Sequence, residues 1–172
     1  MPRKDPLTQD EHASLIASLA HEGQFRRDGK TPYITHPQEV ANRMKGPQLK
    51  AVAWLHDVWE DTMGEELVYD KEYLLSLNVS PTVVEAVEAL THWPQEPNVE
   101  YWGRVKRNKL ALQVKITDII VNLNDLNTTT SDKHLQVPRD RQIIKYAKAL
   151  LFFKAPNLLG LDPGAGGTEF GT

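Results

Sequence analysis

Helix signals recur along this chain of 172 residues while strand signals are weak, and this contrast constrains the fold most strongly. Thr8 and Glu11 have the spacing of a capping box, in which each side chain bonds the other residue's backbone amide. Leu15, Ile16 and Leu19 follow at the spacing of one helix face. No run of alternating β-branched residues is bounded by tight-turn dipeptides. The sequence therefore predicts an all-α fold.

Further helices are expected over residues 37–44, 48–60, 81–90 and 139–153, with two more before Thr128. Pro37 suits the first turn of its helix, and Ser80 followed by Pro81 reads as an N-cap with proline at the first helical position. The polar stretches 24–35 and 128–138 are predicted to be connections.

Length and composition favour one working domain, because 172 residues with 40% hydrophobic and 25% charged content suffice for one buried core. Five of the ten glycines fall within the last 13 residues. Residues 7–154 are therefore the expected domain, and residues 155–172 are expected to form a flexible tail.

Charge and cysteine content exclude several classes of protein. No cysteine is present, so disulfides, thiolate metal sites and cysteine nucleophiles are excluded. A net charge of −3 does not favour binding to long nucleic acids. No apolar run approaches the ~18 residues of a membrane span, and the first residues lack the apolar core of a secretory signal. A cytoplasmic location is expected, while the oligomeric state is left open.

The segment from His56 to Asp61 carries the most chemistry. His56 and Asp57 supply a nitrogen and an oxygen ligand of the kind that bind Mn²⁺, Fe²⁺ or Zn²⁺. On a continuous helix Glu60 would share a face with His56, and Asp61 with Asp57. Taken alone, the same residues could be an exposed helix end with a surface histidine.

Two other segments support a site. His36 lies at a predicted junction between a loop and a helix, immediately before Pro37. Asp118 is surrounded by apolar residues in a predicted helix. A buried aspartate must be paired or must bind a metal, so Asp118 is expected either to be a ligand or to pair with Lys115 three residues before it.

Three segments in this order resemble the motifs of the alarmone-hydrolase branch of HD-domain metal phosphohydrolases. These segments are His21–Pro37, the HDxxED motif within His56–Thr62, and Lys115–Asp118 with Asn122. The branch includes the hydrolase half of the Rel/Spo proteins and the stand-alone Mesh-type small alarmone hydrolases. The resemblance covers about residues 10–150 and implies an HD-domain bundle of seven to eight helices.

The resemblance also implies roles for individual residues. A metal, typically Mn²⁺, would be held by His36, His56, Asp57 and Asp118. Glu60 and Asp61 would assist hydrolysis, and Arg27 would stabilise charge near the scissile phosphate. The substrate-binding positions would be Lys30, Tyr33, Lys115 and Asn122, where Tyr33 is expected to pack or to orient its neighbours.

The expected partner is a small-molecule nucleotide, and the expected reaction removes the 3′-pyrophosphate of (p)ppGpp to give GDP or GTP and pyrophosphate. Asp28 and Asn124 stand where members of the branch often carry basic residues. A less highly charged nucleotide is therefore an open alternative, as for an NADPH 2′-phosphatase or a deoxynucleotide phosphatase. A non-catalytic nucleotide sensor is the alternative from another class.

Overall fold

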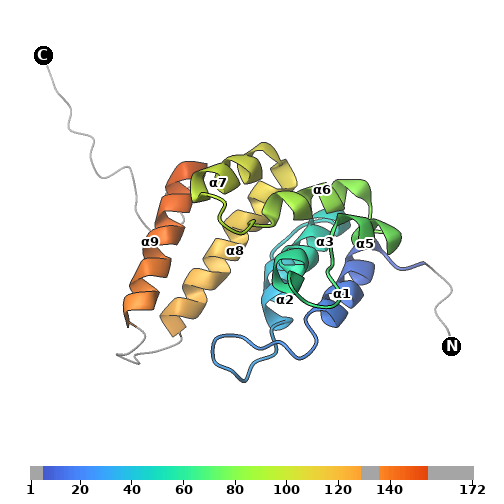
Figure 1. Cartoon of the computed structure of the whole chain (residues 1–172), viewed down its shortest axis with the longest axis horizontal. Coiled ribbons are helices and arrows are strands. Elements are labelled where there is room, and N and C mark those ends of the chain that lie inside the picture. Colours follow the sequence, from blue (N-terminus) through green and yellow to red (C-terminus); the bar gives the residue numbers. More distant parts are fainter. Residues whose placement is uncertain (1–5, 129–135, 155–172) are drawn as a thin grey trace, which may run out of the picture. The chain divides into compact units, whose positions relative to one another are not determined.

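A computed structural model of the protein describes residues 6–128 and 136–154, and every regular element in these ranges is a helix (Figure 1). Phe25 and Pro32 form an isolated β-bridge in the connection between the first two helices. The predicted all-α class is therefore confirmed. The helices are α1 (Gln9–Ala20), α2 (Thr35–Asn42), α3 (Pro47–Leu55), α4 (Val58–Thr62), α5 (Lys71–Ser76), α6 (Pro81–Leu90), α7 (Asn98–Arg107), α8 (Lys109–Thr128) and α9 (Gln136–Phe153).

The chain divides into two compact units, residues 1–121 and 122–172, and each is described by itself. The first contains α1 to α7 and the larger part of α8, and the second contains the end of α8 together with α9. The expected domain over residues 7–154 stays a prediction, and the expected tail over residues 155–172 lies outside the described ranges.

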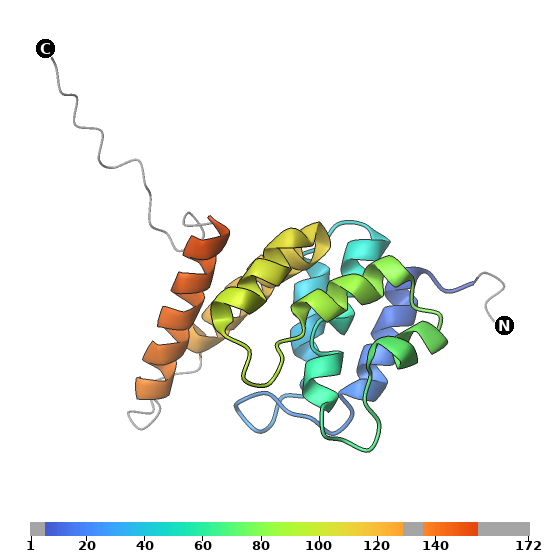
Figure 2. The same cartoon turned by 45° about the horizontal axis from the view of Figure 1, so that its top comes forward.

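Helix α3 is central to the first unit, because it contacts α1, α2 and α6 (Figures 1 and 2). Its residues Ala51, Val52, Ala53 and Leu55 are all buried. A helix with small and branched apolar residues on several faces can pack against neighbours on each of those faces. His56 follows the buried Leu55 directly, so its position is fixed by the packing of α3.

The helix predicted over residues 48–60 is divided in two, which corrects the expectation of one continuous helix. The His56 ring nitrogen Nδ1 lies 2.6 Å from the carbonyl oxygen of Ala53. In an uninterrupted helix that oxygen would accept from the amide of Asp57. Asp57 instead becomes the N-cap of α4, and its carbonyl accepts from the Asp61 amide at 2.9 Å. Asp57 and Asp61 thus keep the expected spacing of one helical turn. His56 and Glu60 do not, because the helix is interrupted between them.

The capping box predicted for α1 is confirmed. The Glu11 amide donates to Thr8 Oγ1 at 3.3 Å, and the Thr8 amide donates to Glu11 Oε2 at 2.9 Å. Ser80 occupies the N-cap position of α6 as predicted, but its hydroxyl makes no capping bond, and Ser80 Oγ is buried without a hydrogen-bond partner within the described ranges.

Other helix boundaries differ by a few residues from the predictions. Helix α2 begins at Thr35, so Pro37 still falls in its first turn. Helix α5 was not predicted; Asp70 caps it by accepting from the Tyr73 amide at 2.9 Å. The two helices expected before Thr128 are α7 and α8.

In the second unit, α9 begins at Gln136, three residues before the predicted start. It buries Tyr146, Ala149, Leu150 and Phe153. Across the described ranges, no helix combines the length and the apolar character needed to cross a membrane.

Candidate metal centre and catalytic groups

Four side chains from four positions in the chain meet within the first unit. His36 is the second residue of α2, His56 follows α3, Asp57 caps α4 and Asp118 lies in α8. His36 and Asp118 are 82 residues apart in sequence, yet their side chains are within hydrogen-bond distance. His36, His56 and Asp118 are all buried. The structure thus brings together all four residues expected to be metal ligands.

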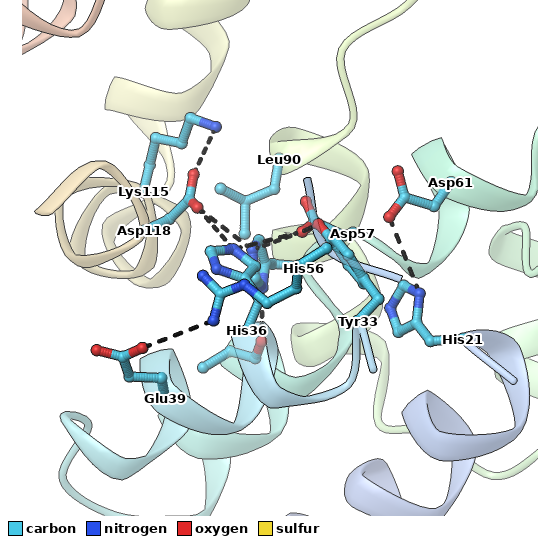
Figure 3. Close-up of polar contacts among 12 residues, drawn as sticks. His21, Tyr33, His36, Glu39, His56, Asp57, Asp61, Leu90, Lys115 and Asp118 are labelled. Atoms are coloured by element: carbon cyan, nitrogen blue, oxygen red, sulfur yellow. Dashed lines mark hydrogen bonds and ion pairs between the residues drawn. The ribbon is translucent and has the colours of Figure 1, made fainter. Parts of the chain in front are cut away.

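The distances between these groups are short (Figure 3). His36 Nε2 lies 3.0 Å from Asp118 Oδ1, and His56 Nε2 lies 3.0 Å from Asp57 Oδ2. The two cross distances are 3.7 Å, from His36 Nε2 to Asp57 Oδ2, and 3.6 Å, from His56 Nε2 to Asp118 Oδ1. The ligand atoms of His36, His56 and Asp118 all lie within 4.8 Å of one another. These three residues could therefore hold a metal ion.

The hydrogen bond of His56 identifies which ring nitrogen faces the cluster. The Ala53 carbonyl only accepts, so His56 Nδ1 carries a proton. In the neutral ring Nε2 then has a lone pair, and this buried atom makes no hydrogen bond with the residues that the structure describes. It faces carboxylate oxygens, which are also acceptors. Either a proton on Nε2 or a metal cation must lie between these acceptors, and two imidazoles with two carboxylates are a suitable ligand set for a divalent transition metal.

The electrostatics of the cluster favour positive charge at its centre. Burial lowers the pKa of His56, but the carboxylates of Asp57 and Asp118 outweigh that effect and hold it well above its usual range. Burial raises the pKa of Asp57 and Asp118, yet the facing cations, His56 for Asp57 and Lys115 with His56 for Asp118, hold both below the usual range. The carboxylates are ionised, as metal ligands must be.

Lys115 supports Asp118 from the opposite side. Its ammonium group donates to Asp118 Oδ2 at 2.9 Å, while Oδ1 faces the two imidazoles. Burial lowers the pKa of Lys115, but Asp118 and Tyr101 raise it well above the usual value. The pairing considered from the sequence is therefore observed. The substrate-binding role expected for Lys115 stays a prediction, because its observed contact orients Asp118.

Tyr33 supports Asp57. Its hydroxyl donates to Asp57 Oδ2 at 2.5 Å, and its ring packs at 4.9 Å from that of His21 and 5.7 Å from that of His36. Tyr33 thus contacts a candidate ligand, while the substrate-binding and orienting roles expected for it stay predictions. The Asp57 side chain is 19% exposed whereas that of Asp118 is 5% exposed. The cluster is accordingly more open on the side of Asp57.

Asp61 lies beyond Asp57 and next to a buried histidine (Figure 3). Its Oδ2 is 3.9 Å from His21 Nδ1, which also lies 2.8 Å from Gln24 Oε1. Burial, reinforced by the charges of Asp57 and Glu60, raises the pKa of Asp61 to about 7. A carboxyl group with this pKa can both hold and release a proton near neutral pH.

Glu60 is exposed and its carboxylate is fixed by a distant loop. The backbone amide of His92 donates to Glu60 Oε2 at 3.0 Å, across 32 residues of sequence. Glu60 and Asp61 are therefore held by separate contacts, one by a backbone amide and the other beside His21.

The loop before α2 places two adjacent arginines differently. Phe25 bridges Pro32, and the Arg26 amide donates to the Thr31 carbonyl at 2.8 Å, so this stretch is locally extended. Side chains alternate in such a segment. Arg26 is half-buried and lies 3.9 Å from Glu39, one helical turn beyond His36 on α2, whereas Arg27 is exposed. Among the described residues, Arg27 makes no hydrogen bond or ion pair.

The substrate-binding roles expected for Lys30 and Asn122 stay predictions. Lys30 is exposed, and its backbone amide donates to Asp28 Oδ1 at 2.9 Å. Asn122 is the first residue of the second unit, so its role stays a prediction.

Sequence reasoning gave no role to Arg26, His21 or His92. The opening motif contains His21, but no spacing rule links it to Asp61, forty residues later. His92 acts through its backbone amide, which no residue type can signal. Residue type does not separate Arg26 from Arg27, and their different exposure is seen only in the structure.

Comparison with known proteins reveals similar sequences among alarmone hydrolases. The chain is 33% identical over 138 residues to the guanosine-3′,5′-bis(diphosphate) 3′-pyrophosphohydrolase of Haemophilus influenzae. The aligned stretch covers 73% of the chain and 20% of that protein. It is 30% identical over 149 residues to the bifunctional (p)ppGpp synthase/hydrolase SpoT of Escherichia coli K12, covering 80% of the chain and 21% of that protein. The chain spans about a fifth of the length of these relatives.

A solved structure supports the fold. It belongs to a metazoan ortholog of SpoT described as hydrolysing ppGpp and acting in starvation responses. It aligns with a TM-score of 0.69 and 19% identity, covering 92% of this chain and 95% of that one. No model of a known family matches the chain. The resemblance to the alarmone-hydrolase branch, inferred from the three motifs, is confirmed.

Proposed function

We propose that this protein is a metal-dependent phosphohydrolase that removes the 3′-pyrophosphate of (p)ppGpp. The observation that carries the proposal is the buried cluster of His36, His56 and Asp118 beside Asp57, with two further carboxyl groups at its edge. The relatives named as 3′-pyrophosphohydrolases supply the reaction class. The products would be GDP or GTP and pyrophosphate.

The ligand set supports Mn²⁺ as the cation. His36, His56, Asp57 and Asp118 would hold it, because their nitrogen and oxygen atoms suit this metal and the more open side at Asp57 leaves room for other ligands. When bound, the cation would acidify a water molecule and neutralise phosphate charge.

Two carboxyl groups of the chain would move protons. Burial and the charges of Asp57 and Glu60 raise the pKa of Asp61, and Asp61 would give a proton to the leaving oxygen. Glu60, fixed by the His92 amide, would take a proton from the attacking water. Lys115 and Tyr33 would hold Asp118 and Asp57 in place during the reaction.

Arg26 is the better-placed cation for the phosphate groups. Its side chain is 18% exposed and reaches α2 one turn from His36, while Arg27 is exposed. A guanidinium held in place can neutralise developing charge without reorganising. The geometry therefore favours Arg26 for the role expected of Arg27, and Lys30 and Asn122 stay proposed substrate contacts. A cytoplasmic location is also proposed, with which the lack of cysteine agrees.

The proposal is tested by turnover of a nucleotide panel with Mn²⁺, containing ppGpp, NADPH and deoxynucleoside monophosphates. Release of pyrophosphate from ppGpp, lost on chelation and in Asp118→Asn, is the expected result. Turnover of only NADPH or a deoxynucleotide would contradict the proposed substrate. No turnover of any nucleotide would contradict an enzymatic function, and full activity in Asp118→Asn would contradict the assigned site.

A further inference from the structure

The loop of residues 91–97, between α6 and α7, closes around the side chain of Arg104. Arg104 comes from α7, and its Nη1 donates to three carbonyl oxygens near the end of α6. These are the carbonyls of Glu88 at 2.7 Å, Ala89 at 3.2 Å and Thr91 at 3.0 Å. The last carbonyls of a helix lack intrahelical partners and carry partial negative charge. The guanidinium therefore caps α6 and fixes where the loop begins.

The same side chain fixes the other end of the loop. Arg104 Nη2 donates to Glu96 Oε1 at 2.7 Å and to Oε2 at 2.5 Å. Glu96 in turn accepts from the Trp93 amide at 3.1 Å, and its carbonyl oxygen lies 2.8 Å from His92 Nε2. One guanidinium thus bonds both ends of the loop through its fork of donors, a geometry that a lysine cannot reproduce.

Aromatic rings complete the support. The Arg104 guanidinium lies 5.8 Å from the ring centroid of Trp93 and 5.6 Å from that of Tyr101. The His92 ring stacks on Tyr101 with centroids 4.6 Å apart and planes at 17°. The side chains of Arg104 and Glu96 are 23% and 13% exposed, so solvent reaches their ion pair only in part. Contacts with Glu96 and Tyr101 therefore fix the position of His92.

This loop supplies the group that holds Glu60. The His92 amide donates to Glu60 Oε2, and within the described ranges this is the one hydrogen bond made by that carboxylate. A long, exposed side chain otherwise samples several rotamers. The direction of the His92 amide therefore sets the direction of the carboxylate.

We propose that Arg104 is a positioning residue for Glu60, acting through the loop of residues 91–97. The inference rests on the proposed function, in which Glu60 takes a proton from water. We call the Arg104 bonds to both ends of the loop the clamp. Loss of the clamp should lower kcat by about tenfold with little change in KM, because Arg104 would affect the orientation of a catalytic group. Mn²⁺ affinity should stay within about twofold, because the metal ligands lie on other elements.

The test is a double-mutant cycle on ppGpp hydrolysis with Arg104→Gln and Glu60→Gln. If Arg104 acts through Glu60, then Arg104→Gln should cost about tenfold in the unmodified chain and less than twofold in the Glu60→Gln chain. Arg107→Ala is the matched control, because Arg107 is an exposed arginine on the same helix, and it should leave kcat unchanged. Equal losses in the two backgrounds would overturn the inference. No loss in Glu60→Gln alone would instead overturn the proposed role of Glu60.

An NMR measurement reads the same contact without turnover. The His92 amide proton of Arg104→Gln should move upfield toward its position in Glu60→Ala, while Arg107→Ala should leave it in place. If Arg104→Gln fails to fold, Glu96→Gln replaces it in the cycle and in the spectra, because it weakens the clamp and leaves the carbonyl contacts of Arg104 intact. An unmoved amide signal in the folded variant would overturn the inference.

Discussion

The two halves of the candidate site are held in different ways. His36, His56 and Asp118 are buried, and Lys115 completes their charge balance from inside the unit. Glu60, by contrast, is exposed and depends on a backbone amide of the loop of residues 91–97. The inner half is fixed by packing of the core, and the outer half by a few polar contacts at the surface. A substitution should therefore be able to disturb the metal ligands without disturbing Glu60, and the reverse.

The largest effect on stability is expected at the inner half, from Lys115→Met. This change leaves the buried carboxylate of Asp118 without its ammonium partner. We expect the free energy of unfolding to fall by about 2–4 kcal/mol, and the affinity for Mn²⁺ to fall by 10–100-fold. Urea unfolding measures the first and metal titration the second. Lys45→Met, at an exposed lysine, should change stability by less than about 0.5 kcal/mol; equal effects of both variants would refute the distinction between the halves.

Arg26 and Arg27 provide a paired test of the outer half. Arg26→Ala should lower kcat/KM for ppGpp by about 10–100-fold, since it removes a fixed cation near the cluster, which amounts to about 1.4–2.7 kcal/mol. Arg27→Ala should cost less than about threefold, because that side chain is exposed. Steady-state kinetics of the two variants decide between the residues. The opposite order of losses would return the role to Arg27.

Asp61 connects catalysis with stability. Its pKa is about 7 in the folded chain and near 3.8 when unfolded, so folding binds a proton between these values. Stability should therefore be highest below pH 3.8 as far as this group is concerned, and should fall as the pH rises to about 7. Asp61→Asn removes this loss and should stabilise the protein by about 1–2 kcal/mol at pH 8 while lowering kcat.

Thermal unfolding at pH 5 and pH 8, with a chelator present, measures that effect. The chelator is needed because a bound divalent cation would itself lower the pKa of a neighbouring carboxyl group. If Asp61→Asn is no more stable than the unmodified chain at pH 8, the ionised Asp61 carboxylate does not lower the stability of the folded chain.

The smallest effect is expected in the loop that carries the arginines. The hydroxyl of Thr31 and the amides of Thr31 and Lys30 donate to the Asp28 carboxylate and lower its pKa from 3.8 to about 2. The stability from this group is present above pH 3.8 and is lost as the pH falls to about 2. Asp28→Asn should therefore be slightly less stable at pH 7 and equal to the unmodified chain near pH 2, as circular dichroism melts can measure. A difference that persists near pH 2 would exclude ionisation as its cause.

Local patterns in the sequence predicted the helical class, the cap of α1 and the place of His36 at the start of α2. They also predicted the buried Asp118, because its neighbours Ile116, Ile119 and Ile120 are apolar. The break after His56 was missed, because it depends on a side-chain bond to the Ala53 carbonyl. The support of Glu60 was missed because its donor is a backbone amide 32 residues away. Short-range spacing thus predicted the inner half better than the contacts that hold the outer half.

Mn²⁺ binding tests the central claim most directly, because the claim is that the buried cluster holds a divalent cation. Electron paramagnetic resonance titrations would compare the unmodified chain with Asp118→Asn and Glu60→Gln. One Mn²⁺ per chain is expected. In Asp118→Asn the affinity should fall by more than about a hundredfold, which exceeds the roughly 10–100-fold effect expected for residues that only support a ligand. In Glu60→Gln the affinity should stay within about threefold of that of the unmodified chain. Unchanged affinity in Asp118→Asn, or no binding by the unmodified chain, would contradict the account.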